Sequence, residues 1–416
     1  MPLLIRNLSC LATPLGSTAR RGPAMREIAV VERAAIVIED GRFAWAGAEN
    51  DLPPEIARSL SDEVDAEGAT ALPGFVDSHT HLPFAGTRET EFNRRLHGET
   101  YEQIAASGGG IAATVSATRS ATEDELAALV LRRTRTMAAC GTTTAEAKSG
   151  YGLDLDHELK QLRAIRRAAT EAPVRLVATC LAAHEIPAEA RGSEEARRAW
   201  IDEIVTTIQP AAAEQRLAFF CDAFIERGVY TPEEGEAILA AGARVGLVPR
   251  VHADELSDTG GAALAARLGA ASADHLMHVS EAGIRAIAGS STIANLLPAT
   301  SLFLMSDRFA PARGLIDAGA AVSLSTDCNP GSSMTESMQL VIQLASLAMR
   351  MTVEEALTAA TLNGAASVRL ASEIGSIEPG KRADVILIDA PSHLHLVYHF
   401  GVNLVKAVWR DGVRVV

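Results

Sequence analysis

The sequence has no segment that is long and apolar enough to cross a membrane. Nowhere does it approach the ~18 uninterrupted apolar residues of a transmembrane helix. Arg6, Asn7 and Pro14 also interrupt the apolar start of the chain before it reaches the length of a signal-peptide core. We therefore expect a protein that is neither membrane-embedded nor secreted.

Cysteine is scarce, and its spacing does not fit a disulfide scaffold. The 416 residues include five cysteines, an odd number, which are widely spaced and form no C-x-x-C pair. This argues against a disulfide framework and against a thiolate zinc site. A reducing cytoplasm is the simplest location for such a chain.

Blocks of basic residues are also missing. The formal net charge of -14 and the isoelectric point of about 5.3 would repel nucleic acid and anionic lipid. We expect neither as a partner. If the substrate of this chain is an anion, a local cation must receive it.

Both ends of the chain are rich in short apolar runs. Asp40-Gly41 lies between two such runs in residues 35–47, and Asp411-Gly412 does the same in residues 405–416. Asp-Gly between apolar runs is a strong hairpin signal. With a further apolar run at 383–390, the pattern predicts that both termini pair into one small sheet domain beside a larger one.

The long middle of the chain alternates short apolar runs with helical stretches rich in Ala, Glu and Arg. This pattern predicts repeated β-α units around a parallel sheet. The eight candidate strands span residues 74–81, 142–149, 174–184, 218–226, 247–255, 271–279, 291–298 and 321–328. Eight units favour a closed (β/α)8 barrel of the TIM type, with its active site at the carboxyl ends of the strands. An open doubly wound sheet is the alternative, but no strand is followed by a glycine-rich phosphate-binding motif.

Polar residues cluster at or near the carboxyl ends of these segments. They are His79, His81, His184, His252, Glu255, His275 and Asp327. Residues i and i+2 of a strand face the same side, so His79 and His81 can grip one ion. A set of His nitrogens and a carboxylate suits zinc or iron(II), which activates water and polarises a carbonyl. Such a site hydrolyses amides, with Glu255 and Asp327 as candidates for moving protons.

Longer motifs carry a family resemblance. The segments PGFVDSHTH, VHADE, ADHL and STD, in this order, are similar to the metal-dependent amidohydrolase superfamily, as is the tail GSIEPGKRADVILID. Narrower segments resemble the imidazolonepropionase family of histidine degradation. These are HLPFAGTRETEF, TYEQIAASGGGIAATVSATR, KSGYGL, CLAAHEIP, LPATSLFL and TDCNPGSS.

The resemblance implies both a domain layout and a set of site residues. A (β/α)8 barrel over residues 67–368 would stand beside a small β-sandwich formed by 1–66 and 369–416. The implied ligands of one divalent metal per chain, Zn2+ or Fe2+, are His79, His81, His252 and Asp327. The implied catalytic residues are Glu255, His275 and Asp327. The implied substrate contacts are Arg88, Tyr101, Tyr151, His184, Glu255, Asn329, Gly331 and Ser332.

The implied reaction is hydrolysis of the ring amide of 4-imidazolone-5-propanoate to N-formimidoyl-L-glutamate. In this acidic chain, Arg88 is our choice of partner for the substrate carboxylate. A metal-dependent purine or pyrimidine deaminase and a catalytically silent scaffold are the rival interpretations. A carboxylated Lys148 bridging two metals, a lid formed by Gly108-Gly109-Gly110, and a homodimer also stay open.

Overall fold

A sheet of parallel strands runs through the middle of the chain in the computed structural model, which describes residues 2–59, 62–99, 103 and 109–416. Its strands follow one another around the sheet in chain order. They are β6 (Phe75–Asp77), β7 (Thr142–Lys148), β8 (Arg175–Ala183), β9 (Phe220–Ile225), β11 (Val251–Ala253), β12 (Ser272–His275), β13 (Ile293–Leu296) and β14 (Val322–Leu324), with the short β10 (Val248–Pro249) beside β9. Each of the eight predicted segments contains one of them, so the predicted barrel is confirmed.

Backbone hydrogen bonds just beyond β6 and β14 bring the first and last strands of this sheet together. The amide of His81 donates to the carbonyl of Cys328 at 3.0 Å, and the amide of Asp327 donates to the carbonyl of His79 at 3.1 Å. A parallel bridge also pairs Thr80 with Cys328. The barrel is therefore closed at the very residues that the sequence predicted to carry its chemistry.

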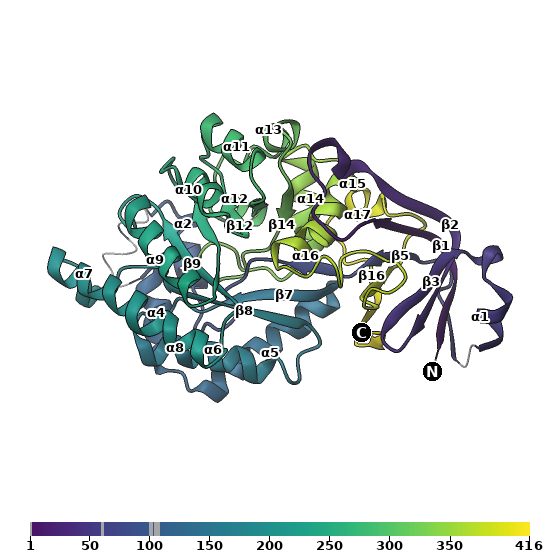
Figure 1. Ribbon diagram of the computed structural model, residues 1–416, viewed down its shortest axis with the longest axis horizontal. Coiled ribbons are helices and arrows are strands. Elements are labelled where there is room, and N and C mark those ends of the chain that lie inside the picture. The colour runs from purple at the N-terminus through teal and green to yellow at the C-terminus, as the bar shows by residue number, and fades with distance from the viewer. Residues whose placement is uncertain (1, 60–61, 100–102, 104–108) are drawn as a thin grey trace.

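Both ends of the chain build a second sheet, which lies beside the barrel in Figure 1. Its strands are β1 (Leu3–Pro14), β2 (Ile28–Glu39), β3 (Arg42–Ala48), β4 (Asp62–Asp65), β5 (Thr70–Pro73), β15 (Val385–Ile388), β16 (Val405–Arg410) and β17 (Val413–Arg414). Strand β5 pairs with β1 and with β15, and so joins the two ends of the chain. The small domain formed from both termini is confirmed, whereas the boundaries at residues 66 and 368 stay a prediction.

The two predicted hairpins are present in this sheet. Glu39 pairs with Arg42 across one turn, and Arg410 pairs with Val413 across the other. In both turns the Asp-Gly pair adopts positive φ, with 50° at Asp411 and 73° at Gly412. This is the backbone that a two-residue turn needs to match the twist of its strands.

Helices cover the outside of the barrel (Figure 1). They are α2 (Glu89–Leu96), α4 (Ile111–Ser120), α5 (Glu123–Ala139), α6 (Leu155–Ala168), α7 (Glu194–Glu203), α8 (Gln209–Glu214), α9 (Pro232–Arg244), α10 (Gly261–Leu268), α11 (Glu281–Ala288), α12 (Pro298–Phe303), α13 (Ala312–Asp317), α14 (Met338–Leu347), α15 (Val353–Thr358) and α16 (Gly364–Ser367), while α1 (Pro54–Ser59) and α17 (His395–Tyr398) lie in the terminal segments. Capping boxes at Thr122, Thr231 and Thr352 start α5, α9 and α15 by satisfying their free backbone amides. Over the described part of the chain, no helix combines the length and apolarity needed to traverse a lipid bilayer.

An ion-pair group fixes the small sheet to the barrel. Arg175, at the start of β8, donates from Nη1 to Asp384 Oδ2 at 2.8 Å and from Nη2 to Asp411 Oδ1 at 2.7 Å. Asp411 is the same residue that turns the C-terminal hairpin. The position of that hairpin on the barrel is thus set by an arginine that bridges two carboxylates.

Candidate active site

Four histidines and one aspartate converge at the carboxyl ends of the barrel strands. His79 and His81 follow β6, His252 lies in β11, His275 ends β12, and Asp327 follows β14. All five side chains are buried. The ring centroid of His79 lies 4.5 Å from that of His252 and 5.3 Å from those of His81 and His275. The sequence-predicted ligands are therefore brought together in one place.

Two three-residue subsets of this cluster have ligand atoms close enough to share one ion. Candidate ligand atoms lie within 4.8 Å of one another in the set His79, His252 and His275, and also in the set His79, His81 and Asp327. His79 Nε2 and His81 Nε2 are each 3.4 Å from Asp327 Oδ1. Within the described residues, His79 Nε2 and both ring nitrogens of His252 are buried without a hydrogen-bond partner. Unsatisfied buried imidazole nitrogens beside a carboxylate fit a metal ion.

The opposite ring nitrogens of two of these histidines face carboxylates. His79 Nδ1 lies 2.8 Å from Asp274 Oδ2, and His252 Nδ1 lies 3.0 Å from Asp222 Oδ2. Both aspartates are fully buried. The His79 contact is a hydrogen bond, whereas the His252 contact is within ion-pair distance only. A carboxylate hydrogen-bonded to one ring nitrogen fixes the tautomer that leaves the other nitrogen free to bind a metal. This arrangement is typical of histidine ligands in metalloenzymes.

Lys148 lies beneath the histidines and ties these carboxylates together. Its Nζ is 2.8 Å from Glu146 Oε1, 2.9 Å from Asp222 Oδ2 and 4.0 Å from Asp274 Oδ2. Arg250 adds a second cation, 3.4 Å from Asp274 Oδ2. Burial favours the neutral amine, but the carboxylates of Asp222 and Glu146 outweigh it and raise the pKa of Lys148. The charged Lys148 therefore acts as a buried counterion. Carboxylation of this lysine, which was considered from the sequence, would require its amine to be neutral.

The remaining acidic groups of the cluster have distinct surroundings. Glu255 Oε2 lies 3.6 Å from His275 Nε2, and burial together with the nearby Asp327 carboxylate raises the pKa of Glu255 to about 8. Asp327 Oδ2 accepts a hydrogen bond from Thr300 Oγ1 at 2.8 Å. Burial lowers the pKa of His275 to about 3, which keeps its ring neutral. Sequence reasoning missed Thr300, although it lies inside the LPATSLFL motif.

His275 and Asp327 also share an uncommon backbone conformation. Their φ angles are 78° and 57°, in the left-handed region that residues with a side chain seldom adopt. Such backbone is held by the surrounding structure and occurs preferentially at functional sites. Here the left-handed conformation occurs at the last residue of β12 and three residues after β14, within the histidine cluster.

A cavity of about 460 Å³ opens above the cluster. Predicted substrate contacts that line it are Arg88, Tyr151, His184, Glu255, Asn329, Gly331 and Ser332. Tyr101 and Gly108 lie outside the described residues, so a substrate contact by the first and a lid role for the glycine run stay predictions. Glu91, Arg95, Phe224 and Leu304 also line the cavity and were missed. Glu91 and Arg95 follow Arg88 by three and seven residues, a helical spacing that would have put all three on one face.

The loop that carries Tyr151 is held by a buried glutamate. Glu158 accepts hydrogen bonds from the amides of Gly150 and Gly152, at 3.1 and 2.8 Å. The carbonyl of Gly150 lies 3.0 Å from His184 Nδ1, so that nitrogen carries the proton and Nε2 is left as an acceptor. Burial, followed by repulsion from His252, lowers the pKa of His184 to about 3. The neutral His184 thus offers the cavity a hydrogen-bond acceptor.

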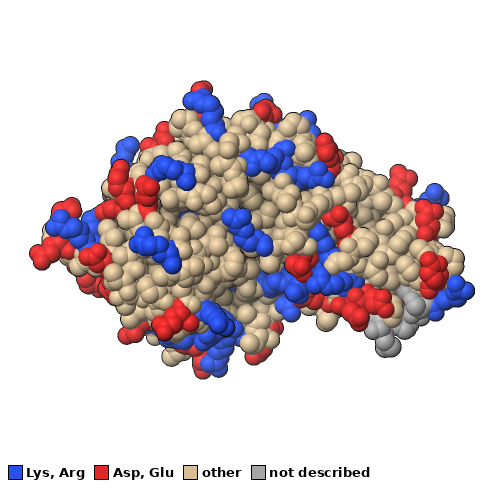
Figure 2. Space-filling view, viewed as in Figure 1, with Lys and Arg blue, Asp and Glu red and all other residues tan. Residues whose placement is uncertain are grey.

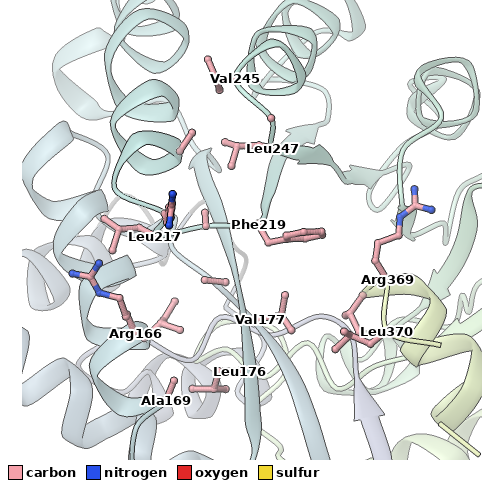
Figure 3. A pocket seen from close by; sticks show the side chains of 17 residues that line it. Arg166, Ala169, Leu176, Val177, Leu217, Phe219, Val245, Leu247, Arg369 and Leu370 are labelled. Atoms are coloured by element: carbon pink, nitrogen blue, oxygen red, sulfur yellow. The ribbon is translucent and has the colours of Figure 1, made fainter. Parts of the chain in front are cut away.

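A second hollow, of about 620 Å³, lies at the opposite ends of the strands (Figure 3). Leu176, Val177 and Phe219 line it, with Arg166 and Arg369 on either side. Leu176 and Val177 lie near the start of β8, and Phe219 directly precedes β9, whereas active sites of such barrels lie at the carboxyl ends of the strands. The smaller cavity, at the carboxyl ends of the strands, is therefore the candidate active site.

Comparison with known proteins agrees with this geometry. The model of the family described as "Amidohydrolase family" matches residues 70–415. An imidazolonepropionase of Porphyromonas gingivalis is 48% identical over 414 residues, which cover 99% of this chain and 97% of that one. An imidazolonepropionase of Geobacillus sp. (strain WCH70) is 46% identical over 419 residues, which cover 100% and 98%.

Solved structures show the same fold at greater distance. A zinc-bound adenosine deaminase of Xanthomonas campestris aligns with a TM-score of 0.70 at 19% identity, covering 99% of this chain and 92% of that one. A 5-methylcytosine deaminase of Klebsiella pneumoniae gives 0.73 at 18% identity, covering 100% and 97%. The fold and the buried histidine-aspartate cluster define a metal-dependent hydrolase barrel, and the chain belongs to the amidohydrolase family. Within it, the nearly full-length relatives place the chain among the imidazolonepropionases.

Removal of the charge on Asp222 tests the buried layer beneath the cluster. We predict that Asp222→Asn lowers the affinity of the protein for a divalent metal by about 10- to 100-fold, the usual cost of losing such a carboxylate. The amide cannot stabilise the imidazole of His252 as a carboxylate does. Competition between the protein and a chelator of known affinity measures the effect. Asp384→Asn is the matched control, since Asp384 is equally buried but pairs with Arg175 away from the cluster. Unchanged metal affinity in Asp222→Asn would refute the role.

Proposed function

We propose that this chain hydrolyses the ring amide of 4-imidazolone-5-propanoate to N-formimidoyl-L-glutamate, a step of histidine degradation. The observation that carries the proposal is the cavity itself, which is lined both by residues of the buried histidine-aspartate cluster and by a rim formed by Arg88, Glu91 and Arg95, with a net positive charge. The nearly full-length similarity to imidazolonepropionases agrees with it. In the reaction, water adds to the ring carbonyl carbon, the bond from that carbon to the ring nitrogen breaks, and the nitrogen takes a proton.

His79, His81, His252 and Asp327 are the proposed ligands of one divalent metal per chain, zinc or iron(II). A metal of this kind supplies Lewis acidity toward a carbonyl and lowers the pKa of water. The ligand set suits it because imidazole nitrogen and carboxylate oxygen bind both zinc and iron.

Glu255 is the proposed carrier of protons. Its carboxylate is buried beside the cluster and 3.6 Å from His275, where it can take a proton from the attacking water and deliver one to the leaving nitrogen. A divalent cation held by the neighbouring ligands would counter the burial that raises the pKa of Glu255 and favour its ionised form. The neutral ring of His275 and the carboxylate of Asp327 are proposed to contact the attacked carbonyl and the water, respectively.

The proposed substrate is an anion. Some of the proposed contacts in the cavity would recognise its ring, and others would recognise its propanoate chain. His184 would accept a hydrogen bond from the ring, and Tyr151 would contact the same end of it. Asn329, Gly331 and Ser332 would border the propanoate side, facing the rim that includes Arg88. On the face shown in Figure 2, acidic and basic side chains are interspersed, so the positive charge that receives the substrate has to be local.

Product analysis tests the proposed function directly. Metal-loaded protein incubated with freshly prepared 4-imidazolone-5-propanoate should yield a product heavier by one water, with the mass of N-formimidoyl-L-glutamate. Loss of the ring absorbance should follow the same time course. Release of ammonia with the ring still closed would favour a deaminase instead, and no turnover of this substrate would refute the proposal.

Metal analysis tests the proposed ligands. We predict close to one equivalent of zinc or iron per chain, lost together with activity on chelation. The double variant His79→Ala/His81→Ala should retain less than about one tenth of that metal, because it loses two of the four proposed ligands. Elemental analysis of the purified proteins measures this. His395→Ala/His399→Ala is the control, since both histidines lie at the distant helix α17. Full metal content in the first variant would exclude the assignment.

The variant Glu255→Gln tests the proton carrier. Glutamine keeps the shape of the side chain but cannot take a proton, so kcat should fall by about 100-fold or more. Metal content and Tm should stay at their wild-type values, because Glu255 is not a proposed ligand. Near-normal turnover would move the role to Asp327 or His275.

A further inference from the structure

Helix α2 presents three charged side chains to the cavity above the histidine cluster. They are Arg88, which precedes the helix, and Glu91 and Arg95 within it. Spacings of three and four residues put all three on one face. Two guanidinium groups and one carboxylate therefore form this part of the cavity wall, with a net charge of +1.

The positive charge of Arg88 is already matched within this group. Its Nε donates to Glu91 Oε2 at 2.9 Å, and the same oxygen accepts from the amide of Gly110 at 3.1 Å. From the sequence, Arg88 is the expected cation that receives the substrate carboxylate. The structure adds that Arg88 already has an acidic partner three residues away, which the charge of the chain alone could not reveal.

Arg95 has no such acidic partner within ion-pair distance among the described residues. Its Nη2 donates to the carbonyl of Gly331 at 3.3 Å, and its guanidinium lies 5.4 Å from the ring centroids of Phe92 and Phe303. The two rings stack on each other at 4.5 Å. This aromatic support holds the guanidinium in position at little entropic cost. Burial, followed by repulsion from Arg88, lowers the pKa of Arg95, so an anion nearby would stabilise its charge.

Both guanidinium groups meet at Gly331, in the loop after β14. Arg95 donates to its carbonyl, and a Cβ on Gly331 would lie 2.3 Å from Arg88 Nη1. Only glycine leaves room for Arg88 to lie this close to the loop. Gly331 and the adjacent Ser332 line the cavity together with both arginines.

We propose that Arg95 is a second binding residue for the substrate carboxylate and that its positive charge, which has no acidic partner among the described residues, selects an acid over a neutral analogue. The inference rests on the proposed function, which makes the substrate a propanoate on a five-membered ring. Arg88, held by Glu91, fixes one side of the carboxylate site, and Arg95, held by two phenyl rings and Gly331, forms the other. Planar forks of this kind bind carboxylates through paired hydrogen bonds.

The test compares two unreactive ligands, 3-(imidazol-4-yl)propanoate and 3-(imidazol-4-yl)propanamide, by calorimetric titration of metal-loaded protein. Both carry the same imidazole, so any contribution of the ring cancels in the ratio of their Kd values. Wild-type protein should prefer the acid, and Arg95→Met should reduce that preference by about 10- to 100-fold. Arg95→Lys should keep part of it, because lysine retains the charge but not the fork.

The adjacent Arg94 provides the matched control. It donates to Glu99 at 2.9 Å and is not among the residues that line the cavity, so Arg94→Met should leave the preference within about threefold of wild type. On 4-imidazolone-5-propanoate, Arg95→Met should raise KM and change kcat little.

Three outcomes would overturn the inference. They are a wild-type protein without preference for the acid, a loss in Arg95→Met that is equal for acid and amide, and a preference that only Arg88→Met removes. An equal loss would mean that Arg95 supports the Gly331 loop and nothing more. Because the two ligands are unreactive, the result is independent of turnover. A protein that prefers the acid through Arg95 but fails to hydrolyse 4-imidazolone-5-propanoate would refute the proposed function, and Arg95 would then select the carboxylate of a different substrate.

Discussion

The buried charge layer beneath the histidine cluster is the constraint on which the rest of the site depends. Lys148 Nζ reaches carboxylates from its own strand and from β9, and Arg250 reaches Asp274 on β12. Charged groups with no solvent exposure cost several kcal/mol each unless they are paired and hydrogen-bonded. Here every charge in the layer has an opposite charge in contact. The layer costs stability, and what it provides is a fixed orientation of His79 and His252.

The barrel explains why this layer forms at all. Lys148, Asp222 and Asp274 lie on β7, β9 and β12, which are not neighbours in the sheet. In a flat sheet they would be too far apart to pair. Closure of the sheet between β6 and β14 turns their side chains toward a common interior. The same closure places Asp327 beside His79 and His81, so one topological event builds both the histidine cluster and the charges beneath it.

Sequence was informative wherever a local pattern carries the signal. Strand periodicity located the eight barrel strands, Asp-Gly located the two hairpins, and the H-x-H pair located the cluster. Pairings between distant strands have no such pattern, so the role of Lys148 emerged only from the fold. Arg95 was missed although its helical spacing from Arg88 is a local signal that puts both on one face. What holds that face of α2 toward the cavity is the Phe92–Phe303 contact with α12, some two hundred residues away in sequence.

Acidic side chains gather around the histidine cluster, and basic side chains of α2 line another part of the same cavity. Asp222, Asp274 and Asp327 surround the histidines, whereas the rim carries an excess of positive charge from α2. A cation is stabilised at the histidine cluster and an anion at the rim. A ligand with a polarisable carbonyl at one end and a carboxylate at the other therefore has one favourable orientation. The reversed ligand would take its carboxylate away from the guanidinium groups of Arg88 and Arg95 and its carbonyl away from the histidine cluster. The orientation of the ligand thus follows from the separation between the acidic histidine cluster and the basic side chains of α2. Contacts such as that of His184 need only refine this orientation.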